Sequence, residues 1–227
     1  DTLERRALLL PADQLSDLNY AFRLLSDGRH LPVLDGSSYR VLLTTSWLEP
    51  SEPQQNRLAL ATFDDKSFAA LKDPTLIREW GNFEDTIQVV GYATDKATVT
   101  TGETMKLTVY YKTLKLVKKS LKIFIHMDKS GGGARIAGDH WPLNPTKHSE
   151  ENKNCGGCYR TDHWLVGDIV RDDFDIEIPE GNTGEYTIWI GLYQPGPDTR
   201  LAVKGFDQKR MKHDGQNRLG LGTIQVK

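Results

Sequence analysis

From residue 87 to its C-terminal end, the chain repeats short runs in which apolar and more polar residues alternate. The alternation is clearest over residues 105–111, 121–127 and 186–192, and glycine-rich turns rather than long helices separate the runs. Successive side chains of an extended strand point to opposite faces, so each run presents one apolar face to a core. The pattern predicts a mainly β chain that folds as an antiparallel β-sandwich, Ig-like or jelly-roll-like.

Three aspartates interrupt one of these predicted strands, over residues 169–178. Alternation places Asp173 and Asp175 on one face of the strand and Asp172 on the other. Asp172 and Asp173, although adjacent in sequence, therefore lie on opposite faces and do not form an acid pair. We therefore interpret the three residues as a solvated strand edge.

The N-terminal part of the chain has a different period. Residues 1–34 read as helical, because Leu15, Leu18, Phe22 and Leu25 recur at helical spacing. We predict that this stripe is a core face, with a partner-binding face as the alternative.

A strand pattern follows the predicted helix over residues 38–47, and a second apolar stretch covers residues 58–63. A proline-rich break separates the two stretches, which suits a hairpin. We therefore predict a small α+β segment, the helix and hairpin of residues 1–78, followed by the β-sandwich of residues 79–227.

Composition limits the class of protein. The chain has 227 residues and a net charge of −2, from 29 basic and 31 acidic residues. This near-neutral balance argues against a nucleic-acid partner, which basic proteins attract. No stretch approaches the roughly 18 consecutive apolar residues of a membrane span. Because the chain begins at Asp1 without a methionine, we expect a processed or trimmed product, from which any export signal would already be gone.

The two cysteines, Cys155 and Cys158, are separated by two glycines. Their polar, glycine-rich surroundings differ from the helix start of a redox motif. We predict a loop-closing disulfide in an oxidising compartment. The alternative is zinc, with ligands drawn from this pair, His148 and His163; a second pair of ligands at zinc spacing is missing.

Histidines and acids gather in the predicted crossover of the sandwich. Strand ends and turns meet there, so these side chains form either a metal or ligand site or a structural hydrogen-bond network, and we favour the network. The group comprises His126, Asp128, Asp139, His140, His163 and Asp168. The metal alternative draws on His126, His140, His148, Cys155, Cys158 and His163. Since no hydrolase or phosphate-loop motif is present, we predict no catalytic residues and no cofactor.

Aromatic residues gather in the same region. Exposed rings on a sandwich stack against sugars, whereas buried rings fill the core, and we favour packing. The alternation places Trp189 outward or in a second layer. The ring-bearing candidates for a ligand site are Trp141, Tyr159, Trp164 and Trp189, with Tyr193 beside them.

Several short motifs occur in an order that resembles a known module. They are Asn82-Phe83, Val90-Gly91-Tyr92, Phe124-Ile125-His126-Met127-Asp128, Asp139-His140-Trp141-Pro142, Trp164 with Gly167-Asp168, Ile178-Pro179, Gly184 with Tyr186, Gly191-Leu192-Tyr193 and Arg200-Leu201. Together they resemble the non-catalytic β-sandwich module of bacterial membrane glycosyltransferases of the protein-mannosyltransferase type, which is also found in exported proteins of unassigned role. The resemblance covers roughly residues 80–227. It implies an extracytoplasmic location and no catalytic residues of the module's own; residues 147–157 depart from the module as an insertion.

These expectations combine into one predicted role. We expect a non-enzymatic, extracytoplasmic binding or assembly subunit of a bacterial envelope or surface complex, with other envelope proteins as partners. We expect it in the periplasm or at the cell surface, and it would reach the membrane through a partner or a removed N-terminal anchor. The first alternative is a carbohydrate-binding module that presents Trp141, Trp164 or Trp189 in a flat exposed row. The second is a metal-dependent enzyme that uses the histidine, aspartate and cysteine cluster, with zinc as its metal.

Overall fold

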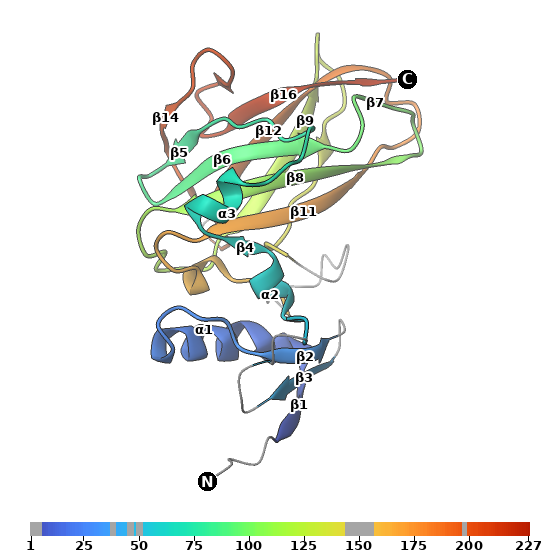
Figure 1. Cartoon of the computed structure of the whole chain (residues 1–227). Coiled ribbons are helices and arrows are strands. Elements are labelled where there is room, and N and C mark those ends of the chain that lie inside the picture. Colours follow the sequence, from blue (N-terminus) through green and yellow to red (C-terminus); the bar gives the residue numbers. More distant parts are fainter. Residues whose placement is uncertain (1–5, 37–39, 45–47, 49–51, 144–156, 197–198) are drawn as a thin grey trace.

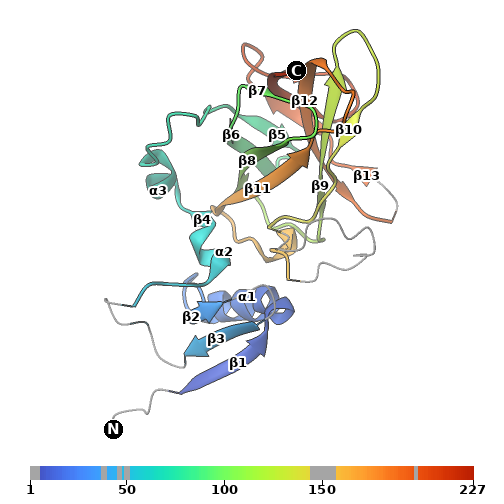
Figure 2. The same ribbon diagram turned by 90° about the vertical axis from the view of Figure 1, so that its right-hand side faces the viewer.

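A computed structural model of the chain describes residues 6–36, 40–44, 48, 52–143, 157–196 and 199–227. The protein is mainly β and has two parts, a small N-terminal α/β unit and a larger β-sandwich (Figure 1). The long helix of the N-terminal unit, α1, lies between the three-stranded sheet of that unit and the sandwich in both views (Figures 1 and 2).

The N-terminal unit is built on a sheet of order β1-β3-β2, from β1 (Ala7–Pro11), β3 (Arg40–Thr44) and β2 (Val33–Gly36). A 3-10 turn, η1 (Ala12–Gln14), leads into α1 (Leu15–Leu25). The helix predicted over residues 1–34 is confirmed at α1 and is wrong at β1, because the leucines of β1 pair with β3 instead of continuing the helix. Residues 1–5 lie outside the described part of the chain. The strand predicted over residues 38–47 is confirmed at residues 40–44; residues 38–39 and 45–47 lie outside the described part of the chain.

The hairpin predicted between residues 38–47 and 58–63 does not form. The second stretch begins as a short helix, α2 (Arg57–Leu60), which the side chain of Asn56 caps by accepting a hydrogen bond from the Leu58 amide. It ends as β4 (Thr62–Phe63), which pairs with a strand of the sandwich. The chain thus joins the sandwich before residue 78, and the division between residues 78 and 79 stays a prediction.

Two sheets make the sandwich. The seven-stranded sheet has the order β10-β9-β12-β16-β15, with β13 on β12 and β7 on β16; the six-stranded sheet has the order β14-β5-β6-β8-β11-β4. The strands of the first sheet are β7 (Thr98–Val99), β9 (Lys122–Lys129), β10 (Ile136–Ala137), β12 (Gly184–Gln194), β13 (Thr199–Arg200), β15 (Lys212–His213) and β16 (Leu219–Val226). The second adds β5 (Gly81–Phe83), β6 (Ile87–Thr94), β8 (Thr104–Thr113), β11 (Ile169–Glu177) and β14 (Val203–Phe206) to β4. The short helices α3 (Asp65–Ala69) and η2 (Thr161–His163) lie in its connections.

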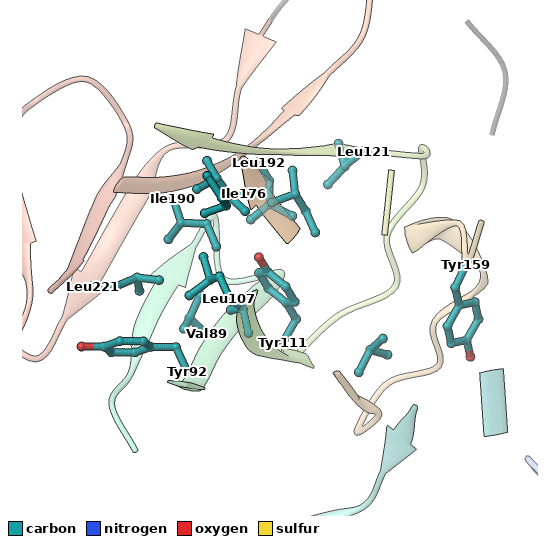
Figure 3. Close-up of a cluster of buried hydrophobic side chains, with 14 of the residues drawn as sticks. Val89, Tyr92, Leu107, Tyr111, Leu121, Tyr159, Ile176, Ile190, Leu192 and Leu221 are labelled. Atoms are coloured by element: carbon teal, nitrogen blue, oxygen red, sulfur yellow. The ribbon is translucent and has the colours of Figure 1, made fainter. Parts of the chain in front are cut away.

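The alternation that predicted the sandwich is confirmed in its core. The apolar members of the three alternating runs are buried, and they meet between the two sheets. Figure 3 shows Leu107 and Tyr111 of β8 with Ile190 and Leu192 of β12. All described strand pairs are antiparallel except β16 with β7. Among the described residues, no helix is both long enough and apolar enough to cross a membrane.

One core residue carries a polar atom that the core does not satisfy. Tyr111 is fully buried, and its hydroxyl has no hydrogen-bond partner among the described residues. By contrast, the buried Tyr159 accepts a hydrogen bond from Arg23 at 3.0 Å. Figure 3 labels both tyrosines.

We expect Tyr111→Phe to stabilise the protein by about 1 kcal/mol, because it removes a buried hydroxyl that makes no hydrogen bond. The matched change Tyr159→Phe removes a hydroxyl that is bonded, so it should cost about 1–2 kcal/mol. Urea unfolding of both variants measures the difference. A loss of stability in Tyr111→Phe equal to that in Tyr159→Phe would contradict the expectation.

Candidate functional site

A buried ion pair joins the N-terminal unit to the sandwich. The guanidinium of Arg23, on α1, donates hydrogen bonds of 2.6 and 2.8 Å to the two carboxylate oxygens of Asp168. The same guanidinium donates to the Tyr159 hydroxyl and to the carbonyl oxygen of Gly28. The Arg23 side chain is 5% exposed and that of Asp168 is 10% exposed. Charge-assisted, two-pronged contacts of this kind fix both distance and orientation.

The rest of the joint is polar as well. Ser16, Asn19 and Arg23 recur at helical spacing and are all buried on α1. The hydroxyl of Ser16 lies 2.9 Å from Nδ1 of His163, whose ring stacks on Tyr20 at a centroid distance of 4.7 Å.

Asn19 extends the joint toward the following segments of the chain. Its side-chain oxygen accepts hydrogen bonds from the Leu31 amide and the Asn56 side chain, and its side-chain nitrogen lies 3.3 Å from His30. Sequence reasoning missed Ser16, Asn19 and Arg23, although their spacing of three and four residues was a visible signal. We call this set of contacts the polar joint.

Burial in the polar joint changes the acid–base properties of its members. Burial, together with the nearby charge of Arg23, lowers the pKa of His30 to about 4. Burial also lowers the pKa of His163 and raises the pKa of Tyr159 to about 12. For Arg23, burial opposes the charge, but the hydrogen bond to Asp168 and the field of Tyr159 raise its pKa overall. The joint therefore holds Arg23 charged and its histidines neutral near neutral pH.

The leucine side of α1 is largely open. Leu15 is buried, but Leu18 is 37% exposed and Leu25 is 90% exposed; Phe22 lies between them and is half-buried. The prediction that this stripe is a core face is therefore wrong for Leu18 and Leu25. The C-terminal end of α1 extends past the three-stranded sheet (Figure 1).

More apolar side chains are exposed in the same unit. Leu8 and Leu9 of β1 are each 54% exposed, and Leu24 of α1 is 60% exposed. Among the described residues, five of the ten exposed large apolar side chains lie between residues 8 and 25. We call Leu18, Phe22 and Leu25 of α1 the leucine surface; Leu8 and Leu9 are adjacent in β1, so their side chains point to opposite faces of that sheet. Large exposed apolar patches mark interaction sites.

The predicted group of histidines and acids is spread over three places. His163 and Asp168 belong to the polar joint. His126 lies 3.6 Å from Asp139, on the outer side of the seven-stranded sheet. On the same side, Asp128 forms ion pairs with Arg135 and Arg218 at 2.6 Å each. His140 is elsewhere, with a partner that the sequence did not suggest.

That partner is Asp172, which corrects its interpretation as part of a solvated edge. Asp172 is 2% exposed, and its carboxylate lies 2.7 Å from Nε2 of His140 and accepts a hydrogen bond from the Leu143 amide. Nδ1 of His140 faces the Gly138 carbonyl, and its ring stacks on Phe174. Both ring nitrogens are thus engaged, and the pair anchors the chain just before residues 144–156.

No three described histidine, cysteine, aspartate or glutamate residues are placed to hold a metal ion together. His148 and Cys155 lie outside the described residues, and Cys158 is fully buried. The disulfide between Cys155 and Cys158, and zinc as its alternative, stay predictions.

The flat exposed row of tryptophans does not form. Trp164 is fully buried and donates its ring N–H to the Tyr159 carbonyl behind the polar joint. Trp141 is 6% exposed, so it is not an open stacking surface either. Trp189 lies on the outer face of its sheet as predicted, but it is half-buried, with the Arg218 guanidinium 4.7 Å above its ring.

Comparisons with known proteins leave the family open. No family model and no curated protein matches the chain. Among solved structures, the chain is similar to "the C-terminal domain of wzt", with a TM-score of 0.44 and 11% identity over 68% of this chain and 82% of that one. It is also similar to the Pseudomonas fluorescens alkylpurine DNA glycosylase AlkC, solved with DNA containing an abasic site analog. That match has a TM-score of 0.32 and 11% identity, over 62% of this chain and 30% of the glycosylase.

We expect Arg23→Met to lower the free energy of unfolding by about 3–5 kcal/mol, because it leaves the buried Asp168 carboxylate without its cation. The control is Arg160→Gln, which breaks ion pairs of a side chain that is 38% exposed and should cost less than about 1 kcal/mol. Chemical denaturation measures both. Equal effects of the two changes would show that the pair does not hold the joint.

The polar joint should also weaken in acid. The pKa of His30 is about 4 in the folded protein, below its ordinary value of 6.5, so folding favours the neutral ring. Its contribution to stability is therefore complete above pH 6.5 and is lost as the pH falls from there through 4. We expect His30→Gln to reduce the loss of stability between about pH 7 and pH 4, measured by urea unfolding. The exposed His213→Gln is the control; an identical pH profile for both variants would contradict the assignment.

Proposed function

We propose that this protein is a non-enzymatic assembly subunit that docks onto another protein through the leucine surface of its N-terminal unit. The observation that carries the proposal is the inverted burial of α1. The helix buries Ser16, Asn19 and Arg23 against the rest of the chain and leaves Leu18 and Leu25 open. Exposed leucines on a fixed helix suit an apolar segment of a partner protein.

Charge favours a protein partner over a membrane. Residues 6–36 contain three arginines and four aspartates, which gives this segment a net charge of −1. One of the three arginines, Arg23, is already neutralised by Asp168 inside the joint. Surfaces that bind anionic lipids need an excess of Lys and Arg around the apolar face. The leucine surface has no such excess.

The envelope location belongs to the same proposal. It is supported by the cysteine pair, which suits an oxidising compartment, and by the resemblance of the sandwich to modules of exported bacterial proteins. The engagement of His140, His163 and Asp168 in structural contacts supports a non-enzymatic role.

The test is affinity capture from the envelope fraction of the source organism, followed by reconstitution of the captured protein with the purified chain. The probes are the wild-type chain, the variant Leu18→Ser/Leu25→Ser and the control Leu60→Ser/Leu116→Ser. The control residues are each 60% exposed and lie outside α1 and the three-stranded sheet. We expect one protein that binds the wild type and the control at equal strength, and the leucine-surface variant at least about tenfold more weakly.

Other occupants of the leucine surface give different results. Equal binding of all three probes to the reconstituted protein would overturn the proposal. Self-association of the purified chain that the leucine-surface variant abolishes would identify a second copy as the occupant. Binding of the wild type, but not the variant, to anionic lipid vesicles would identify a membrane. Either of these two outcomes would overturn the proposal that a partner protein binds the leucine surface.

A further inference from the structure

The outer face of the seven-stranded sheet carries aromatic rings from neighbouring strands. Because Ile123 and Ile125 of β9 face the core, Phe124 faces outward; the same rule places Trp189 and Tyr193 of β12 outward. Phe124 lies over Gly191, where an added Cβ would approach the ring to 2.2 Å. The glycine thus lets this ring lie flat on the sheet.

Basic side chains lie on these rings. The guanidinium of Arg200 lies 4.6 Å from the Phe124 ring centroid, and the Lys122 ammonium lies 5.4 Å from the Trp141 centroid. Both are cation–π contacts, which orient the cations without neutralising them. Within the described part of the chain, neither Lys122 nor Arg200 forms an ion pair with a carboxylate. Arg218, over Trp189, differs because Asp128 and Asp214 neutralise it.

The two unneutralised cations flank one ring. In the sheet register, Tyr193 of β12 lies directly opposite Lys122 of β9 on one side and Arg200 of β13 on the other. Directly opposed residues have their side chains on the same face, about 5 Å apart at Cβ. Tyr193 is half-buried, and so are Lys122 and Arg200. Lys122, Tyr193 and Arg200 thus form a row across three strands, and the Tyr193 ring lies 6.1 Å from the Phe124 ring that carries the Arg200 guanidinium.

We propose that the row Lys122–Tyr193–Arg200 binds an acidic polysaccharide, through a sugar ring that carries a carboxylate. The apolar face of the sugar would pack on Tyr193, as sugars pack on aromatic rings, and the carboxylate would accept hydrogen bonds from Arg200 or Lys122. Arg200 uses one terminal nitrogen on the Gln216 carbonyl, which fixes the guanidinium beside the ring.

The chemistry of the row favours a uronic acid over a nucleic acid. Strong binding to a phosphate backbone needs many cations and a positive protein, but this chain has a net charge of −2. A polysaccharide with one carboxylate per sugar has fewer charges per unit length than a DNA duplex, which carries one per about 1.7 Å.

The experiment measures binding of polygalacturonate to the folded full-length chain by calorimetry. The test variant is Lys122→Gln/Arg200→Gln, and the control Lys72→Gln/Lys106→Gln removes the same charge from exposed lysines away from this row. Tyr193→Leu tests the ring separately. Far-ultraviolet circular dichroism and thermal unfolding establish that each variant is folded. We expect the test variant to lose at least about tenfold in affinity, the control to lose less than about twofold, and neutral dextran not to bind.

Each other result overturns the proposal. Failure of the wild type to bind polygalacturonate shows that the row is a structural cover of the sheet. Equal losses in the test and control variants show unspecific attraction to charge. Single-stranded DNA that competes for the same row at equal strength shows recognition of polyanions rather than of an acidic sugar. Should the double variant not fold, Arg200→Lys with Tyr193→Leu takes its place under the same criteria.

Discussion

The buried pair of Arg23 and Asp168 determines how the two parts of this protein fit together. A charged guanidinium that is buried from solvent needs a carboxylate with matching geometry. Asp168 accepts two hydrogen bonds from the Arg23 guanidinium. Leaving either charge alone would be costly, so the pair fixes the rotation of α1 about its own axis. Ser16 and Asn19 follow Arg23 into the interface because they lie on the same side of the helix.

This rotation explains the unusual surface of the N-terminal unit. A helix of a small domain normally turns its leucines inward, whereas α1 turns its polar residues toward the sandwich and part of its leucine stripe to solvent. The apolar contacts of Leu15 with the short three-stranded sheet still contribute to the core. The open leucines belong to α1 and the cation-bearing face belongs to the seven-stranded sheet, so the two proposed binding roles use different residues.

The sequence predicted the sandwich because alternation is a local signal that the strands themselves carry. The sequence analysis assigned the wrong face of α1 to the core. Leucines at helical spacing predict the buried face only when no stronger interaction, such as a buried ion pair, orients the helix. Here the competing partner, Asp168, lies 145 residues away from Arg23. Asp172 was wrongly assigned to a solvated edge for a similar reason. Alternation predicts which face of the strand a residue lies on, but it does not predict that His140 packs against that face. The hairpin predicted between residues 38–47 and 58–63 does not form because β4 pairs with β11, a strand far along the chain.

The claim that the polar joint fixes the N-terminal unit can be tested by hydrogen exchange of Asp168→Asn. This change keeps the shape of the side chain and removes its charge. We predict that amides of α1 and of the three-stranded sheet lose protection, while amides of β8 and β12 in the sandwich keep theirs. Unchanged protection of α1 in Asp168→Asn, or an equal loss of protection throughout the chain, would contradict this account.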